Sequence, residues 1–277
     1  MQAIVDEISG MQGIADIKTT KRVPRDFYDT VDRFLAAYDA YAAIARDHLD
    51  LGDKPRAGQG EGTVACHEMP MGVTPLEALA IYRKIRTWKD FPAVAERMSK
   101  QGEELFADIQ SGHKGGNPEQ IRMTSRAVRE GRAKYAQRGH ACPFLDEGKG
   151  RCRVWEVRPV VCRGHHITGP IELANPQHER HAEAKATNIR VPVRQQLAIG
   201  NLDRRMELAL SPFLHVGVLQ LMQLAEGEVI TEVGEAPQKM QQDGRVAQKA
   251  NRNVKHSAKN QKKKKKDKAK AKKKKKK

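Results

Sequence analysis

The sequence predicts a mostly α-helical protein, with a helical body, an irregular Cys-rich metal-binding knuckle and a disordered C-terminal tail. Apolar residues recur at helical spacing in several segments, and no long run alternates apolar and polar residues as a sheet would. Three cysteines fall within twenty-one residues, and the chain ends in a lysine-rich stretch. We expect a cysteine-cluster metal-binding domain over residues 1–245 and a disordered tail over residues 246–277.

The first clear helix is expected over residues 27–49, where apolar side chains follow one helical face. Gly52 is a plausible end to it. The Gly-rich, polar stretch 52–63 then predicts a loop that delivers Cys66.

The start of a second helix is marked by a complete set of N-terminal capping residues. Thr74 is a suitable N-cap, Pro75 fits the first helical position, and Glu77 can reach back to complete a capping box. The predicted buried stripe of this helix consists of Ala78, Ile81, Tyr82, Ile85 and Trp88.

Three further helices follow from the same reasoning. One begins near Pro92, and another begins at Asn117 and can end at Gly139. A last helical stretch covers residues 202–226, interrupted by a proline. Its apolar part, residues 212–225, is too short to span a bilayer and is expected to be a buried core helix, so no membrane association is predicted.

Arg122, Arg126 and Arg129 share one face of the helix expected after Asn117. Such a stripe could bind an anion, but acidic residues lie on the same helix. The pattern therefore favours a solvated face.

The four cysteines are the most informative residues. Cys142, Cys152 and Cys162 lie ten residues apart, and Cys66 lies upstream. The N-terminal sequence lacks the basic start and apolar core of a signal peptide, so we expect a cytoplasmic protein whose thiols stay reduced. Metal binding by these thiols is the favoured interpretation; buried apolar cysteines and redox sensing are the alternatives.

The residues around the cysteines suit a metal site. Gly139, Gly148 and Gly150 permit tight turns, and nearby arginines should favour thiolate over thiol. These arginines are Arg151, Arg153, Arg158 and Arg163. Asp146 and Glu147 are less favoured as ligands. Four histidines near the cysteines could replace a weak ligand, namely His67, His140, His165 and His166. His178 and His181 are expected on the surface of a helix.

The motifs CPFL (142–145), GRCRVWE (150–156) and RPVVCR (158–163) resemble the YkgJ-type cysteine-cluster family, which is described as a zinc- or iron-chelating domain. Cys66 and the following VTPLE resemble the family's upstream half, where the family has several cysteines and this chain has one. The resemblance and the spacing together imply one metal centre. It would be a zinc ion, an iron ion or an iron–sulfur cluster. Its ligands would be Cys66, Cys142, Cys152 and Cys162.

Two other functions remain open. The cysteine pattern is similar to that of flagellin lysine methylases, which implies an iron–sulfur enzyme related to protein lysine methylation. The basic tail at residues 246–277 could instead bind RNA, ribosomes or other nucleic acid without sequence specificity. No Gly-rich phosphate loop, HExxH pair or nucleophile elbow identifies an enzyme.

The positive charge is confined to the tail. Of 51 Lys and Arg residues, 18 fall within residues 245–277, together with one of the 34 acidic residues, so the rest of the chain carries 33 of each sign. The net charge of +17 therefore describes the tail alone. Like charges repel along it and few apolar residues can offset its ordering entropy.

Deleting residues 246–277 should leave metal content and thermal unfolding unchanged, because the tail has no means of packing. The same deletion should remove most RNA binding at low salt, measured by titration over a salt series, since the remaining chain is electrically neutral. Binding that persists after the deletion would place a nucleic-acid site in the body, first of all at the face carrying Arg122, Arg126 and Arg129.

Overall fold

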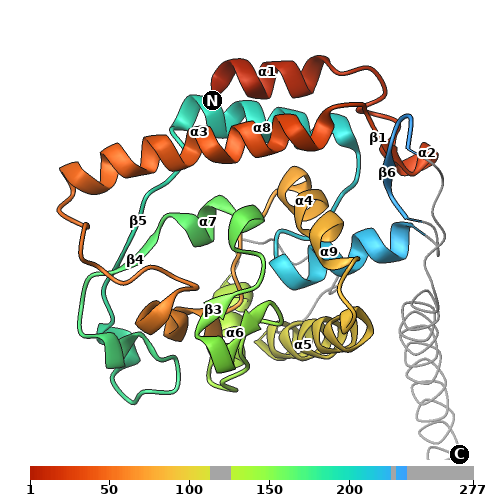
Figure 1. The fold of residues 1–277 in the computed structure, drawn as a ribbon. Coiled ribbons are helices and arrows are strands. Elements are labelled where there is room, and N and C mark those ends of the chain that lie inside the picture. Colours follow the sequence, from red (N-terminus) through yellow and green to blue (C-terminus); the bar gives the residue numbers. More distant parts are fainter. Residues whose placement is uncertain (113–125, 226–228, 236–277) are drawn as a thin grey trace, which may run out of the picture.

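The computed structural model describes residues 1–112, 126–225 and 229–235. Helices dominate these residues, as predicted, and the strands are two or three residues long (Figure 1). No helix among the described residues combines the length and apolar character that a membrane crossing requires.

The α-helices are α1 (Gln2–Gly10), α2 (Ile17–Thr20), α3 (Phe27–His48), α4 (Pro75–Ile85), α5 (Phe91–Gly112), α6 (Arg126–Ala136), α7 (Val160–Arg163), α8 (Val193–Met206) and α9 (Leu214–Leu224). The 3-10 helices are η1 (Gly60–His67), η3 (Glu147–Lys149), η4 (Trp155–Val157), η5 (Ile171–Ala174) and η6 (His181–Glu183). The strands are β1 (Arg22–Val23), β2 (Leu145–Asp146), β3 (Arg151–Cys152), β4 (His165–Ile167), β5 (Ala186–Asn188) and β6 (Thr231–Glu232). They form three pairs, β1 with β6 in parallel and β2–β3 and β4–β5 antiparallel.

The helices pack in tiers. Helices α1, α3 and α8 lie along one side, α4 and α9 lie beneath them, and α5 packs on α6 at the far side (Figure 1). The main core joins α1, α3, α4, α8 and α9, and a smaller cluster joins α5, α6 and α9. Fully buried side chains of the main core include Phe27, Phe34, Tyr38, Tyr82 and Leu221. Each such side chain contributes about 1.5–3 kcal/mol through burial.

Several predicted helices are confirmed. Helix α3 covers almost the whole of residues 27–49, and α5 begins one residue before Pro92. The capping box of α4 is present in full, because the Thr74 side chain accepts from the Glu77 amide and the Glu77 carboxylate accepts from the Thr74 amide. The apolar stretch 212–225 contains α9, whose side chains are largely buried.

Other expectations need correction. Cys66 lies in the 3-10 helix η1 and not at the end of a loop. Trp88 lies beyond the end of α4. Helix α8 begins at Val193, earlier than the predicted start at residue 202. The prediction missed its first turns because the side chains of Val193 and Leu197 are exposed, so these turns carry no apolar stripe.

Some predictions concern residues outside the described part. The helix start at Asn117, with Arg122, and the tail at residues 246–277 both lie there. The described part of that helix, α6, ends at Ala136, three residues before Gly139. Its Arg126 is exposed and pairs with Glu130 at 2.5 Å, as expected for a solvated face.

A buried carboxyl group lies on α8. Among the described residues, Asp203 has one carboxyl oxygen, Oδ1, that is buried without a hydrogen-bond partner. Burial raises the pKa of Asp203 to about 7, and the nearby Glu77 carboxyl adds to the increase. The folded protein therefore holds a proton here that the unfolded chain, with a carboxyl pKa of about 3.9, has already released near neutral pH.

This difference makes stability depend on pH. Because the folded pKa is raised, the stabilisation is complete below about pH 4, falls as pH rises towards about 7, and stays at its lower value above that. Asp203→Asn should remove this fall and make the protein more stable than wild type at pH 8, as measured by urea unfolding followed by circular dichroism. The exposed Asp53 supplies the control Asp53→Asn, and parallel wild-type and Asp203→Asn profiles would contradict the assignment.

Candidate metal centre

The four cysteines come from four separate segments. Cys66 lies near the end of η1, Cys142 precedes β2, Cys152 ends β3, and Cys162 lies in α7. All four are free thiols and are partly exposed.

Backbone hydrogen bonds hold three of these segments together. The Cys142 amide donates to the Cys66 carbonyl oxygen at 2.7 Å, and the Cys152 amide donates to the Gly58 carbonyl oxygen at 2.8 Å. Strand pairing places Leu145 opposite Cys152 in the β2–β3 hairpin. The upstream segment that carries Cys66 therefore lies directly against the downstream cysteine motifs.

Gly58 is required at this junction. Its φ is +86°, a conformation that favours glycine, and a Cβ there would lie 3.0 Å from the Cβ of Cys152. The sequence marked the surrounding stretch only as a Gly-rich loop. No pattern in it indicated that one glycine lets two chain segments approach each other.

The segment that carries Gly58 also contacts β4. The Ala57 amide donates to the His165 carbonyl oxygen at 3.2 Å, and the Ile167 amide donates to the Pro55 carbonyl oxygen at 2.9 Å. Residues 55–60 thus run between β3 and β4 and fix both relative to η1.

Cys162 is positioned through Glu77. The carboxylate accepts from the Thr74 amide at 2.9 Å and the Thr74 hydroxyl at 2.8 Å, while its other oxygen accepts from the Val160 amide at 2.7 Å. Val160 is the first residue of α7, so this one carboxylate binds the N-termini of both α4 and the helix that carries Cys162. The sequence predicted the first of these roles and missed the second.

The four thiols lie close enough to affect one another's ionisation. Burial raises the pKa of Cys142, and the Cys66, Cys152 and Cys162 thiols raise it further. Burial also raises the pKa of Cys162, with added contributions from Cys66 and Cys152. The pKa of Cys66 rises to about 12, again through burial first and Cys152 second. The four thiols thus lie within electrostatic reach of one another.

Backbone amides point towards three of the sulfur atoms. The Gly58 amide donates to the Cys66 sulfur, and the amides two residues after Cys142 and Cys152 donate to those sulfurs. Each of these hydrogen bonds lowers the thiol pKa, because it stabilises the thiolate. This arrangement suits sulfur atoms that carry negative charge.

The arginines act on the thiols less than the sequence suggested. Arg158 lowers the pKa of Cys66, Cys152 and Cys162, and Arg163 lowers that of Cys152. Burial nevertheless outweighs them, and the pKa of every one of the four thiols is raised. The predicted direction of the arginine effect is therefore confirmed for Arg158 and Arg163, although burial is the larger effect.

Arg153 has another role. It forms a bidentate ion pair with Asp90, with both N–O distances at 2.7 Å, and its guanidinium lies 3.7 Å from the centre of the Trp88 ring. It therefore ties the cysteine segment to the start of α5. Asp146 is also engaged locally, since its carboxylate caps η3 by accepting from the Lys149 amide at 3.2 Å.

The thiols do not form a preformed cage. Within residues 1–112, 126–225 and 229–235, no three His, Cys, Asp or Glu side chains are arranged so that they could hold a metal ion as they stand. The donor set nevertheless fits a soft metal, because it comprises four thiols in mutual electrostatic contact with amide donors on three of them. Binding must therefore couple to thiol deprotonation and to side-chain adjustment.

Each histidine near the cysteines uses one ring nitrogen elsewhere. The partners are Gly139 O for His67 (3.1 Å), Glu104 for His140 (2.6 Å), Asn188 for His165 (2.8 Å) and Gly164 O for His166 (3.0 Å). One nitrogen of each ring remains for other contacts, so the histidines stay candidate replacement ligands.

The expectation for His178 and His181 is wrong. The two residues do not share a helix, and His181 begins η6. Its ring is partly buried and contacts the Leu173 carbonyl oxygen at 2.8 Å and the Glu68 carboxylate at 3.0 Å. It links the segment after β4 to the end of η1.

A cavity of about 760 Å³ reaches one of the four cysteines. Its lining includes Cys152, Gly58 and Trp155, together with Lys84 and Asp146. Cys152 is thus accessible from outside, which gives an entry path to the centre.

Comparison with known families identifies the downstream cysteine segment. Residues 112–187 match the CxxCxxCC family, whose model is described as "Putative zinc- or iron-chelating domain". The resemblance seen in the sequence is confirmed. The CxxCxxCC match contains Cys142, Cys152 and Cys162 and leaves out Cys66, and it supports a metal-binding role with zinc or iron. Searches of curated proteins and of solved structures found no match.

Glu77 supplies a test of how the centre is held together. Glu77→Ala should destabilise the protein by about 2–4 kcal/mol, because it removes hydrogen bonds at two helix N-termini. Thr74→Ala removes only the α4 cap and should cost about 1 kcal/mol. Urea unfolding measures both.

The difference between the two variants reports the bonds that the Glu77 carboxylate accepts from the Thr74 and Val160 amides. Glu77→Ala should also lower metal content, whereas Thr74→Ala should not. Equal destabilisation in the two variants, with equal metal content, would show that the contact with α7 contributes nothing.

Proposed function

We propose that this protein binds one zinc or iron centre through Cys66, Cys142, Cys152 and Cys162. The observation that carries the proposal is the backbone bond from Cys142 to Cys66, at 2.7 Å. It brings the one upstream cysteine, which lies outside the matched family segment, against the three within it.

The electrostatics support the full set of four. The Cys66 and Cys152 thiols raise the pKa of both Cys142 and Cys162. Four thiolates suit tetrahedral zinc, an iron site or an iron–sulfur cluster. The positive charges of Arg158 and Arg163 would offset part of the negative charge of such a site.

Metal binding would stabilise this fold. The four cysteines lie on short elements and turns, and not on the long helices. Short strand pairings and individual backbone hydrogen bonds join these segments. A shared ligand set constrains η1, β3 and α7 together, so the free energy of binding would contribute to folding.

Protein purified anaerobically should contain about one zinc per chain, or iron with matching sulfide, measured by elemental analysis. Cys66→Ala and Cys142→Ala should each lose most of this metal. The ultraviolet–visible spectrum identifies it, because zinc thiolate gives no visible band whereas an iron–sulfur cluster gives broad absorption above 300 nm.

Two controls sharpen the result. Phe144→Leu disturbs the core beside Cys142 without removing a thiol and should keep its metal. His67→Ala and His165→Ala test replacement ligands and should also keep it. Metal retained in Cys66→Ala but lost in a histidine variant would reassign the fourth ligand, and metal-free wild-type protein would overturn the proposal.

A further inference from the structure

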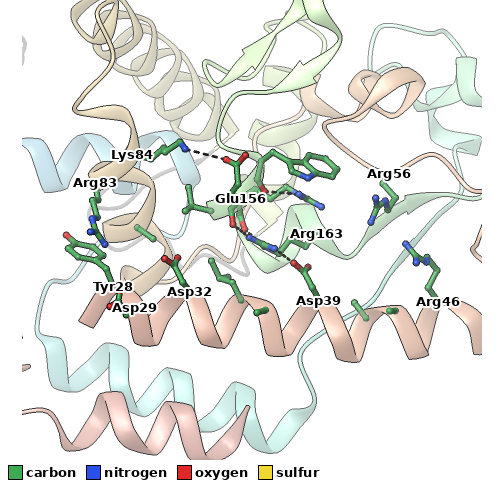
Figure 2. Close-up of a pocket in the computed structure, with 18 of the residues that line it drawn as sticks. Tyr28, Asp29, Asp32, Asp39, Arg46, Arg56, Arg83, Lys84, Glu156 and Arg163 are labelled. Atoms are coloured by element: carbon green, nitrogen blue, oxygen red, sulfur yellow. Dashed lines mark hydrogen bonds and ion pairs between the residues drawn. The ribbon is translucent and has the colours of Figure 1, made fainter. Parts of the chain in front are cut away.

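A second cavity, of about 870 Å³, lies between α3, α4 and the segment that carries Trp155 and Arg163. It contains none of the four cysteines. Figure 2 shows its length, with Tyr28, Asp29 and Arg83 at one end and Arg46 and Arg56 at the other.

Three of the six Lys and Arg side chains that line this cleft have clear partners. Lys84 pairs with Glu156 at 3.5 Å, and Arg163 pairs with Asp39 in the middle of the cleft (Figure 2). Arg83 stacks on an aromatic ring at 4.4 Å. These groups need no ligand to explain them.

The other end of the cleft is different. Its lining includes Arg46, Arg56, Arg158 and His166, a group that we call the basic end. Arg158 is only 4% exposed and His166 only 2% exposed. Among the described residues, Arg46 Nε, Arg158 Nε and His166 Nε2 are buried atoms with no hydrogen-bond partner. Tyr28 Oη is a fourth such atom, at the far end of the cavity. Buried polar groups in proteins nearly always have partners, so the three atoms gathered at the basic end favour a ligand that can hydrogen-bond there.

The backbone fixes this group. Arg56 and His166 face each other in an antiparallel bridge. The guanidinium carbons of Arg56 and Arg158 lie 5.5 Å and 3.3 Å from the centre of the Trp155 ring. Arg46 reaches from α3 towards Arg56, as Figure 2 shows.

The cations at the basic end repel one another. Burial and then Arg46 lower the pKa of Arg56, and burial followed by Arg163 lowers that of Arg158 to about 10. Burial and the charges of Arg56 and Arg46 lower the pKa of His166. Holding like charges together in a partly desolvated cavity is unfavourable unless an anion binds between them.

We propose that the basic end of this cleft binds the phosphate group of a small metabolite. Arg158 Nη1 donates to the Trp155 carbonyl oxygen at 2.8 Å, which leaves its Nε and the guanidinium groups of Arg46 and Arg56 as donors. Several such donors suit the oxygens of a tetrahedral phosphate better than the two coplanar oxygens of a carboxylate. His166 complements them. Its Nδ1 lies 3.0 Å from the Gly164 carbonyl oxygen and therefore carries the hydrogen, which leaves Nε2 to accept a hydrogen bond from a singly protonated phosphate.

The rest of the cleft argues for a small molecule and against a nucleic-acid backbone. Asp32 and Asp39 line the α3 side between the two ends, and Asp29 lies on α3 at the far end. These carboxylates would repel a second phosphate, but they can accept hydrogen bonds from hydroxyl or amino groups. The volume of about 870 Å³ is that of a cavity for one metabolite.

The basic end contains none of the four cysteines, but it adjoins the proposed metal centre, because Arg158 acts on three of the thiols. Binding is measured with the full-length protein as purified, with its metal content recorded. The probes are inorganic phosphate, glycerol phosphate and acetate, at constant ionic strength set with sodium chloride. The signal is the fluorescence of Trp155 in a Trp88→Phe background, because the chain has two tryptophans.

Phosphate should change the fluorescence in a saturable way and bind at least about tenfold more tightly than acetate. Arg46→Gln and Arg56→Gln should each weaken binding about tenfold or more, as expected for the loss of a charged hydrogen bond. Both side chains are partly exposed, so these variants should remain folded. Arg194→Gln, at an exposed position of α8 outside the cleft, removes the same charge and should leave binding unchanged.

The lysine-rich C-terminal segment is present in every variant, so its contribution to phosphate binding cancels in the comparison. Saturable binding of glycerol phosphate would identify a phosphorylated metabolite as the ligand, whereas binding of inorganic phosphate alone would identify the free anion. Equal binding of acetate, or equal effects of Arg46→Gln, Arg56→Gln and Arg194→Gln, would overturn the proposal.

Discussion

The buried carboxylate of Glu77 connects the helical body to the cysteine segment. It is 1% exposed and accepts hydrogen bonds from two helix N-termini that lie far apart in the sequence, at Thr74 and Val160. Burial raises its pKa, while the bonds from Thr74 and Val160 and the charge of Arg163 oppose that increase. A carboxylate can remain in such a place only because its oxygens have these partners. The position of Cys162 therefore depends on the same group that begins α4.

Two opposing effects act on the four sulfur atoms. Removal from water favours the neutral thiol, whereas amide donors and Arg158 favour the thiolate. Desolvation is the larger effect, so the amide donors and Arg158 reduce the cost of deprotonation without reversing it. The same surroundings become favourable once a cation shares the cavity, because low polarity strengthens the attraction between thiolate and metal. The basic end of the other cleft has the opposite problem, because its positive charges repel one another and Asp39 offsets them only in part.

The sequence predicted what is decided locally. The helices α3 and α5 follow from their apolar spacing, and the α4 capping box follows from four consecutive residues. The ligand set came from cysteine spacing and family motifs. What the sequence could not predict depends on contacts between distant segments: the close approach of Gly58 to Cys152, and the meeting of Arg46 with Arg56. Neither arginine lies in a motif, and only the fold makes them neighbours.

The order of the cysteines along the chain has a consequence for synthesis. The Cys66 carbonyl oxygen accepts a hydrogen bond from the amide of Cys142, which lies 76 positions later in the chain. Cys162 lies 96 positions after Cys66. At about 5–20 residues per second, Cys66 leaves the ribosome about 5–20 s before the last of its partners. Until Cys142 emerges it is a solitary thiol, without the Glu77–Val160 contact or the β2–β3 hairpin to enclose it. A nascent chain is therefore most open to oxidation or to capture of the wrong metal at this stage, and the complete four-thiol set exists only after residue 162 has emerged.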